Sequence, residues 1–250
     1  MIDTHCHVFC EYFDDIPSLL LDIKKNGIDK IIVNGTDMKS NLEVLKLVKE
    51  YDCIYGAIGF HPTELLEFDS ECLKWLEEHI NDEKIIALGE IGLDYHYDNT
   101  DKNKQINVFR KQLEIASKYK KPVIVHSRDA MKDTYDILSE FELRGSIHCF
   151  SGSLEMATRF IKLGFYIGIG GVSTYKNAKN IVDVIKNIPL EYILLETDSP
   201  YLTPEPLRGQ INTPTNVVII AKRISQIKNV LFEDVVNITT LNATSLFDFL

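Results

Sequence analysis

The sequence predicts an α/β fold, a single (β/α)8 TIM barrel whose metal site lies at the C-terminal mouth of the strands. Short apolar runs alternate with segments of helical periodicity, eight such runs can be counted, and polar residues of metal-binding type follow most of them. Parallel neighbours need long crossovers, and eight such units close into a barrel with its catalytic groups at the mouth. An open doubly wound sheet would show the same alternation, but the placement of the polar residues favours the barrel.

The expected strands are short and rich in β-branched residues, and their near-continuous apolar character is what parallel strands covered on both faces require. The first strand is the N-terminus itself, where His5 and His7 stand one residue apart and share a face. The fourth strand is expected to end before Gly89-Glu90, with a loop over residues 92–96. The eight strands are expected at residues 1–7, 30–34, 54–59, 85–88, 123–125, 146–147, 165–169 and 192–195.

The segments between these strands carry apolar residues at helical spacing, for example Leu42, Leu45 and Val48. Gly27 is positioned to end the first helix, since glycine is the usual residue just past a helix C-terminus. Two further helices close the chain. The helices are expected within residues 13–26 and at 41–50, 72–80, 104–119, 131–141, 155–163, 178–187, 217–227 and 232–242.

Length and composition predict one compact domain over residues 1–250. Single α/β barrels commonly have this length, and no low-complexity tract or long Pro/Gly/Ser linker divides the chain. The formal charge of -10 argues against a broad basic surface for nucleic acid, because phosphate affinity comes largely from Lys and Arg. Bound divalent cations reverse the charge locally, so the acidic total is compatible with phosphate chemistry.

The five cysteines are odd in number and form no C-x-x-C pair, which indicates a reduced interior and a cytoplasmic protein. Cys6 and Cys149 each stand beside a histidine but have the opposite strand parity, so they should face the helical layer as small apolar residues. No apolar run reaches membrane-spanning length, and no signal peptide is expected at the polar N-terminus. We expect no membrane association and no obligate protein partner.

Metal-binding residue types occur at the C-terminal ends of six predicted strands, the first, third, fourth, fifth, sixth and eighth. In a barrel these ends surround one mouth, so the scattered residues become one site. Five of the seven histidines belong to the set, which a random scatter over helices and loops would rarely produce. The set consists of His5, His7, His61, Glu90, His126, His148 and Asp198.

Each of these residues also has an ordinary structural interpretation. A lone histidine after a strand, such as His126 or His148, is more often a packed, hydrogen-bonded residue than a ligand. Glu90 could cap a turn, and Asp198 could form an Asx turn before Ser199-Pro200. Each such interpretation explains one residue, and none explains the shared strand ends.

Imidazoles and carboxylates without a thiolate suit divalent ions such as Zn²⁺, Mn²⁺ or Mg²⁺. Glu90, central in strand order, is the expected bridge between two ions, which together activate a water for hydrolysis. Asp198 is then placed to accept the proton of that water as a general base. The expected ligands besides Glu90 are His5, His7 and Asp198 for one ion, and His126 and His148 for the other.

The chain resembles the TatD-type metal-dependent deoxyribonucleases of the amidohydrolase-like TIM-barrel superfamily. The matching motifs run in order from residue 1 to about residue 215, and this series is far more specific than a lone H-x-H. The motifs are Asp3-Thr4-His5-Cys6-His7, Gly59-Phe60-His61-Pro62, Gly89-Glu90-Ile91-Gly92-Leu93-Asp94-Tyr95, His126-Ser127-Arg128-Asp129-Ala130, His148-Cys149-Phe150-Ser151-Gly152 and Glu196-Thr197-Asp198-Ser199-Pro200-Tyr201-Leu202, followed by Pro204, Pro206, Arg208-Gly209, Asn212 and Pro214.

The resemblance implies hydrolysis of phosphodiester bonds in DNA, as a 3′-5′ exonuclease that acts on single strands or 3′ ends with two or three divalent ions. It implies substrate contacts by His61, Arg128 and Arg208, and catalytic roles for Glu90 and Asp198. Thr63 departs from the family pattern, because many relatives carry a second histidine there. By motif match, the implied metal ligands are His5, His7, Glu90, His126, His148 and Asp198.

Two other functions remain open. An amidohydrolase-type enzyme could cleave a small-molecule or aminoacyl ester or amide on the same metal site, a reading favoured by the acidic charge and by the versatility of the fold. A metal-stabilised binding module is the other, although structural metal sites are usually closed, whereas this set lines an open mouth. Glu90 stands where superfamily members that act on amides or rings often have a modified lysine, and this favours the nuclease-like branch.

Overall fold

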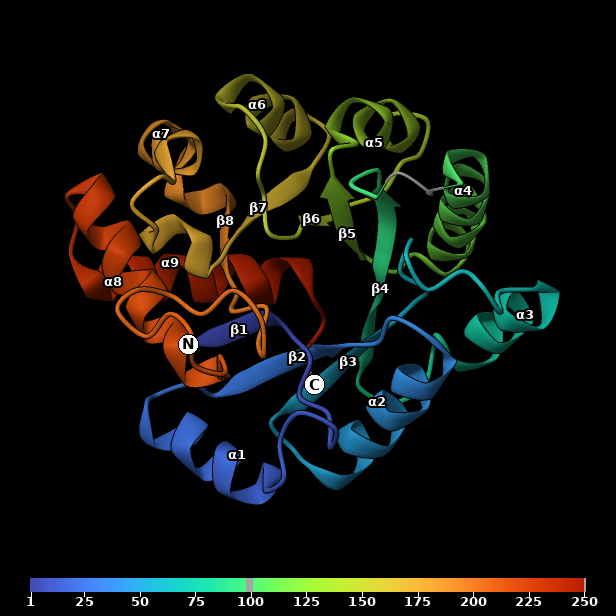
Figure 1. Ribbon diagram of the computed structural model, residues 1–250, viewed down its shortest axis with the longest axis horizontal. Helices are drawn as coiled ribbons and strands as arrows, with labels where there is room; N and C mark the ends of the chain where they lie inside the picture. Colours follow the sequence, from blue (N-terminus) through green and yellow to red (C-terminus); the bar gives the residue numbers. More distant parts are fainter. Residues whose placement is uncertain (98–100, 250) are drawn as a thin grey trace.

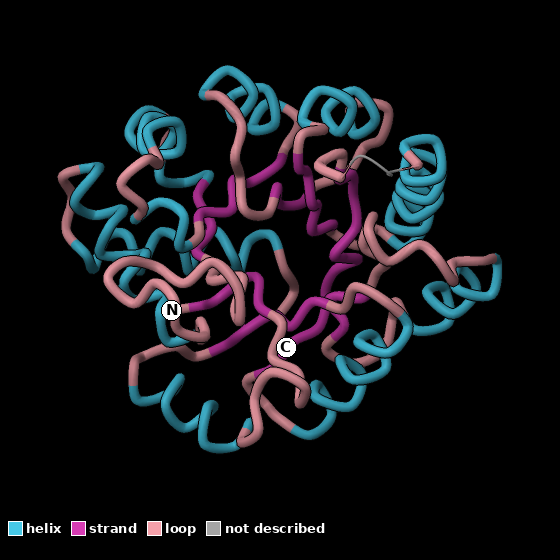
Figure 2. Tube along the Cα trace, in the orientation of Figure 1, coloured by secondary structure: helices cyan, strands magenta, loops and turns pink. Residues whose placement is uncertain are grey.

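The computed structural model describes residues 1–97 and 101–249, and it confirms the predicted barrel. Eight parallel strands follow one another in sequence order around a single sheet, from β1 (Ile2–Cys6) to β8 (Ile193–Leu195). Figure 1 shows the strands as a ring inside a shell of helices, and Figure 2 shows the same two layers by colour. Of the predicted unit 1–250, residues 98–100 and 250 lie outside the described part.

The helices alternate with the strands as the apolar spacing predicts. The intermediate strands are β2 (Lys30–Asn34), β3 (Ile54–Ile58), β4 (Ile85–Asp94), β5 (Val123–Arg128), β6 (Gly145–Ile147) and β7 (Phe165–Ile169). The helices are α1 (Ile16–Lys25), α2 (Met38–Glu50), α3 (Ser70–His79), α4 (Lys102–Tyr119), α5 (Met131–Leu138), α6 (Leu154–Lys162), α7 (Lys179–Asn187), α8 (Val217–Lys228) and α9 (Phe232–Leu246), and the 3-10 turns are η1 (Gly171–Thr174), η2 (Leu190–Tyr192) and η3 (Pro214–Asn216).

The barrel is closed by contacts between the first strand and the segment after the last one. The backbone N–H of Asp198 donates to the His5 carbonyl at 2.9 Å, and that of His7 donates to the Ser199 carbonyl at 2.7 Å. The buried Asp3 carboxylate accepts from the backbone N–H of Thr197 at 2.9 Å and from its hydroxyl at 2.5 Å. Closure therefore brings the residues around His5 and Asp198 to the same point of the mouth.

The prediction that the fourth strand ends before Glu90, with a loop over 92–96, is wrong. β4 continues to Asp94, because Gly92 pairs with His126 of β5 and Asp94 pairs with Arg128. A glycine is required at position 92, since an added Cβ would lie 1.9 Å from the His126 carbonyl oxygen. The β5 residues that pair with this part of β4 lie far from it in the sequence, so the local pattern of residues 85–94 cannot indicate the pairing.

An irregularity of the β4–β5 pairing aims Glu90 into the mouth. Leu88 pairs with Val123 and Ile91 pairs with Val125, so three steps along β4 match two steps along β5. One extra residue of this kind is a β-bulge, which re-aims a side chain and is common beside active sites. Glu90 lies within this bulge and is 3% exposed, at the floor of the mouth.

Apolar residues pack on both sides of the barrel wall, one cluster against the helices outside it and a smaller cluster inside it. In β2, Ile31 and Val33 pack in the cluster that contains the helices, whereas Ile32 packs in a smaller cluster inside the barrel. Phe247, at the end of α9, joins the inner cluster and covers the N-terminal ends of the strands. Cys6 packs in the outer cluster as predicted, whereas Cys149 lies half-buried in the turn after β6. Within the described ranges, no helix has the length and apolar character needed to cross a bilayer.

Candidate metal centre

Glu90 lies between two groups of imidazoles, and each of its carboxylate oxygens faces one group. Its Oε2 lies 3.3 Å from Nε2 of His5 and 3.5 Å from Nε2 of His7. Those two Nε2 atoms are 3.2 Å apart, and Oδ1 of Asp198 lies 3.7 Å from the first and 3.5 Å from the second. Two nitrogens and two carboxylates thus converge on one small space.

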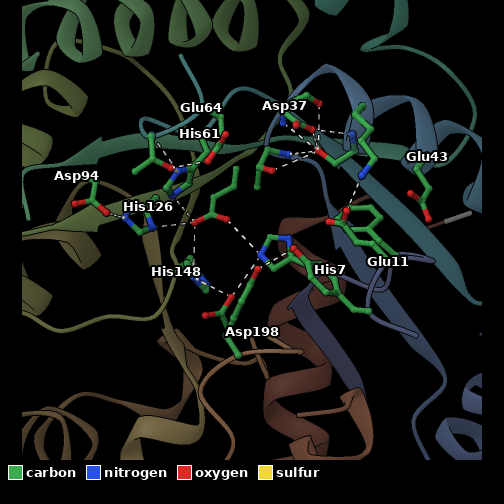
Figure 3. Close-up of a pocket in the computed structure, with 18 of the residues that line it drawn as sticks. His7, Glu11, Asp37, Glu43, His61, Glu64, Asp94, His126, His148 and Asp198 are labelled. Carbon is green, nitrogen blue, oxygen red and sulfur yellow. Dashed lines mark hydrogen bonds and ion pairs between the residues drawn. The ribbon is translucent and has the colours of Figure 1, made fainter. Parts of the chain in front are cut away.

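The other oxygen of Glu90 faces the second group. Its Oε1 lies 2.9 Å from Nδ1 of His126, 3.6 Å from Nε2 of His61 and 3.8 Å from Nε2 of His148. The His126 ring is held from its far side by Asp94, whose Oδ2 is 3.2 Å from Nε2. Figure 3 shows side chains from both groups pointing into one cavity, among them His7, His61, His126, His148 and Asp198.

The structure brings all seven residues predicted from the strand ends together, but it groups them differently from the expectation. His148 stacks on His5 with 3.5 Å between ring centroids, and its Nε2 lies 3.6 Å from Asp198 Oδ1. His61 lies beside His126, with 4.3 Å between the ring centroids, and its expected role as a substrate contact stays a prediction. The three groups whose donor atoms lie within 4.8 Å of one another are His5, His148 and Asp198; His5, His7 and Glu90; and His61, Glu90 and His126.

The Asn34 carbonyl holds the His7 ring by a hydrogen bond, and a carboxylate lies behind the ring of His148. Nδ1 of His7 lies 2.9 Å from the Asn34 carbonyl, to which it donates, so its Nε2 lone pair faces the cavity. Nδ1 of His148 lies 3.2 Å from Oε1 of the buried Glu196. Carbonyls and carboxylates behind ligating histidines are the usual second layer of a metal site.

Asp94 and Glu196 were not among the predicted site residues. Glu196 directly follows the predicted eighth strand, so it carries the same signal as Glu90 and Asp198, a carboxylate at a strand end. No such signal marks Asp94, because the predicted fourth strand ends before Glu90 and the extension of β4 to Asp94 depends on its pairing with β5.

The donor set fits divalent ions. Imidazole and carboxylate ligands converge with no thiolate among them, which suits Zn²⁺, Mn²⁺ or Mg²⁺. A cation facing His5, His7 and Glu90 would meet two Nε2 atoms and a carboxylate oxygen. The number and identity of the ions remain predictions, as do the roles of the individual ligands.

Neighbouring histidines keep both candidate catalytic carboxylates ionised against the effect of burial. Burial acts to raise the pKa of Glu90, but His5, His61 and His148 outweigh it and hold that pKa well below its usual range. Burial likewise opposes ionisation of Asp198, and the neighbouring histidines, His148 foremost, lower its pKa. Burial together with the nearby His126 lowers the pKa of His61 to about 3, so this ring is neutral.

Three imidazoles have the opposite shift. Burial acts to lower the pKa of His148, but Glu196, Asp198 and Glu90 outweigh it and raise that pKa to about 10. The carboxylates raise the pKa of His7 and His126 against burial in the same way. A proton on His148 therefore balances part of the carboxylate charge at neutral pH when no other cation is bound.

The site opens into a cavity of about 510 Å³, whose wall includes Arg128. Thr63, which departs from the expected motif, places its hydroxyl 2.7 Å from Nδ1 of His61 and so orients that ring. Arg208 is not among the described residues of this wall. Its guanidinium lies 4.3 Å from the centre of the Tyr175 ring.

An eight-stranded barrel with imidazoles and carboxylates gathered at its mouth is the architecture of a metal-dependent hydrolase. The sequence model of the TatD related DNase family matches residues 2–248. The chain therefore belongs to this family, as its motifs predict.

The relatives agree with this assignment. The chain is 41% identical over 251 residues to YabD of Bacillus subtilis, an uncharacterized metal-dependent hydrolase, and the match covers 99% of this chain and 98% of YabD. The crystal structure of YjjV, a TatD homologue from Escherichia coli, superposes with a TM-score of 0.95 at 33% identity, over 99% of this chain and 98% of YjjV. A TatD family hydrolase from Entamoeba histolytica superposes with a TM-score of 0.87 at 25% identity, over 100% of this chain and 98% of that one.

Metal binding should release protons. A protonated histidine cannot bind a metal, so an ion that enters the site must displace the proton of His148, and the raised pKa values of His7 and His126 act in the same direction. The pKa of His148, raised to about 10, means that its proton is present at neutral pH, so the affinity for Mn²⁺ should rise as the pH is raised towards about 10. Calorimetric titration in two buffers of different ionisation enthalpy measures the release. Identical heats in both buffers would contradict this protonation pattern.

Replacing Glu90 by glutamine should lower metal affinity at least about tenfold, a loss that even outer partners of a metal site can cause. The amide removes the charge that faces both histidine groups. Metal content after dialysis, measured by atomic emission, and hydrolytic activity should fall together. Glu43→Gln is the matched control, because Glu43 lines the same cavity but belongs to none of the three donor groups. Full activity of Glu90→Gln without metal would refute the assignment.

Proposed function

We propose that the protein is a metal-dependent deoxyribonuclease that hydrolyses phosphodiester bonds of DNA from the 3′ end of single strands. The observation that carries the proposal is Glu90, whose two oxygens face separate groups of histidines at the floor of an open cavity. A carboxylate in this position suits a pair of ions that act on one phosphate. The motifs shared with TatD-type nucleases supply the substrate class.

The residues divide the chemistry among them. When bound, divalent ions polarise a phosphoryl oxygen and lower the pKa of a coordinated water. Asp198 is the proposed general base, because its carboxylate is ionised and 14% exposed, so that it reaches both the donor group and the cavity. Glu90 lies between the two histidine groups and contacts both of them. Its negative charge offsets part of the positive charge of the bound ions.

Arg128 is the proposed phosphate contact on the cavity wall. It stands at the end of β5, two residues after His126, and its guanidinium lies 5.8 Å from the centre of the Tyr97 ring. A guanidinium matches the oxygens of a phosphate with paired donors. His61 is the proposed second contact, although its position beside His126 also suits a metal ligand. Arg208 is assigned to the substrate through the family motif.

One observation favours a second function, hydrolysis of a small-molecule or aminoacyl ester or amide. Besides the donor groups and Asp94, which holds His126, four more carboxylates line the same cavity, in a chain with a formal charge of -10. Their negative charges disfavour the binding of a long polyanion but do not oppose the binding of a small substrate. These carboxylates are Glu11, Asp37, Glu43 and Glu64.

The proposed setting is the cytoplasm, with DNA as the partner. All five cysteines are free thiols, which supports a reducing compartment. Neither a membrane nor a second protein is required by the proposed reaction, since the donor groups and the cavity belong to one chain.

Oligonucleotides labelled separately at the 5′ and 3′ ends test the function. With Mg²⁺ or Mn²⁺, a 3′-labelled strand should release a labelled mononucleotide at once, and a 5′-labelled strand should shorten step by step. Single strands should be cleaved faster than blunt duplexes. Intact DNA together with turnover of ester or amide substrates would replace the proposal by the second function, and no turnover of either class at full metal loading would favour a binding module.

A further inference from the structure

Two tyrosines form one lip of the cavity. Tyr201, after β8, is 49% exposed, and Tyr12, after β1, is half-buried beside it. Their ring centroids lie 5.9 Å apart at an angle of 70°, and their hydroxyls are hydrogen-bonded at 2.9 Å. Both line the cavity that contains Glu90, and the Tyr201 ring lies 6.1 Å from that of His7. An open aromatic surface thus stands directly beside one donor group.

The backbone that carries Tyr201 is fixed to the metal centre. Its N–H donates to the carbonyl of Asp198 at 2.8 Å. Its own carbonyl accepts from Nδ2 of the buried Asn212 at 2.6 Å, and the same amide donates to the Thr197 carbonyl at 2.9 Å. A ring held in place before binding loses little conformational freedom when it makes a contact.

The charges around the cavity favour one orientation of a bound strand. Arg128 ends β5, which lies across the eight-stranded ring from β1 and its neighbour β8. On the tyrosine side the wall contains Glu11, whose charge is offset by Lys39 at 2.6 Å, and Glu43, so that these three side chains together carry one negative charge. A phosphate group is therefore favoured near Arg128 and disfavoured beside the glutamates on the tyrosine side. The terminal nucleoside of a strand has no further phosphate, so it is the part of the strand that fits the tyrosine side.

Resting on the proposed function, we infer that the Tyr201 ring, held by Tyr12, is a stacking surface for the unpaired base of the 3′-terminal nucleotide. The scissile phosphate then lies over Glu90, and the rest of the strand leaves on the Arg128 side. Aromatic side chains bind bases of single strands by stacking, with little sequence preference because every base has a flat face. A paired terminal base is not free to stack, so this subsite selects frayed or single-stranded ends.

The test uses the full chain loaded with Mn²⁺ and two 5′-labelled single strands. The strands are identical except that the 3′-terminal residue of one carries a base and that of the other is a stable abasic residue. We expect kcat/KM for the base-bearing strand to be at least about fivefold higher, as one lost stacking contact implies. Tyr201→Phe should keep this preference, and Tyr201→Leu should abolish it by slowing cleavage of the base-bearing strand only.

Tyr192→Leu is the matched control, since Tyr192 is an exposed tyrosine in η2, at the opposite end of the barrel strands. It should leave both rates unchanged. Equal cleavage of the two strands by the unaltered protein would overturn the base subsite and leave the nuclease proposal standing. Equal slowing of both strands by Tyr201→Leu would also overturn it, because the ring would then serve only the loop that carries Asp198. Cleavage of neither strand would remove the nuclease proposal and the subsite with it.

Discussion

The arrangement of the candidate metal centre depends on one buried carboxylate. Glu90 is 3% exposed, and burial of an isolated charge is costly enough that its neighbours must compensate for it. The β-bulge aims it inward, five imidazoles surround it, and protons on some of those imidazoles balance the charge of the metal-free site. The same arrangement makes the pocket a cation site, since anything that replaces those protons must itself be positive.

Barrel closure sets the other half of the site. Strands β1 and β8 meet through Asp3 and Thr197, and the same contacts bring His5 and His7 beside Asp198. The N-terminal segment therefore both closes the barrel and supplies two histidines to the site. Because the loop after β8 carries both Asp198 and Tyr201, a single backbone segment positions a proposed base for the reaction and a proposed surface for the substrate.

Most of the barrel and the membership of the site could be predicted from local patterns. Apolar runs and helical spacing identified eight strands, and histidines at strand ends identified the mouth. The length of β4 could not be predicted, because it depends on Gly92 packing against His126, a partner more than thirty residues away. The spatial arrangement of the site residues depends on the folded barrel for a similar reason. Only the folded barrel stacks His148 on His5, places His61 beside His126, and puts Asp94 and Glu196 behind two of the rings.

We expect Glu90 to lie between two cation positions, one on each carboxylate oxygen. A crystal structure of the Mn²⁺-loaded protein, with anomalous scattering recorded for manganese, measures this most directly. We predict two peaks about 3.5 to 4 Å apart, the distance typical of two-metal hydrolytic sites, with Oε1 and Oε2 of Glu90 on different ions. Ions bound elsewhere, or a single ion that does not touch Glu90, would contradict this role of Glu90.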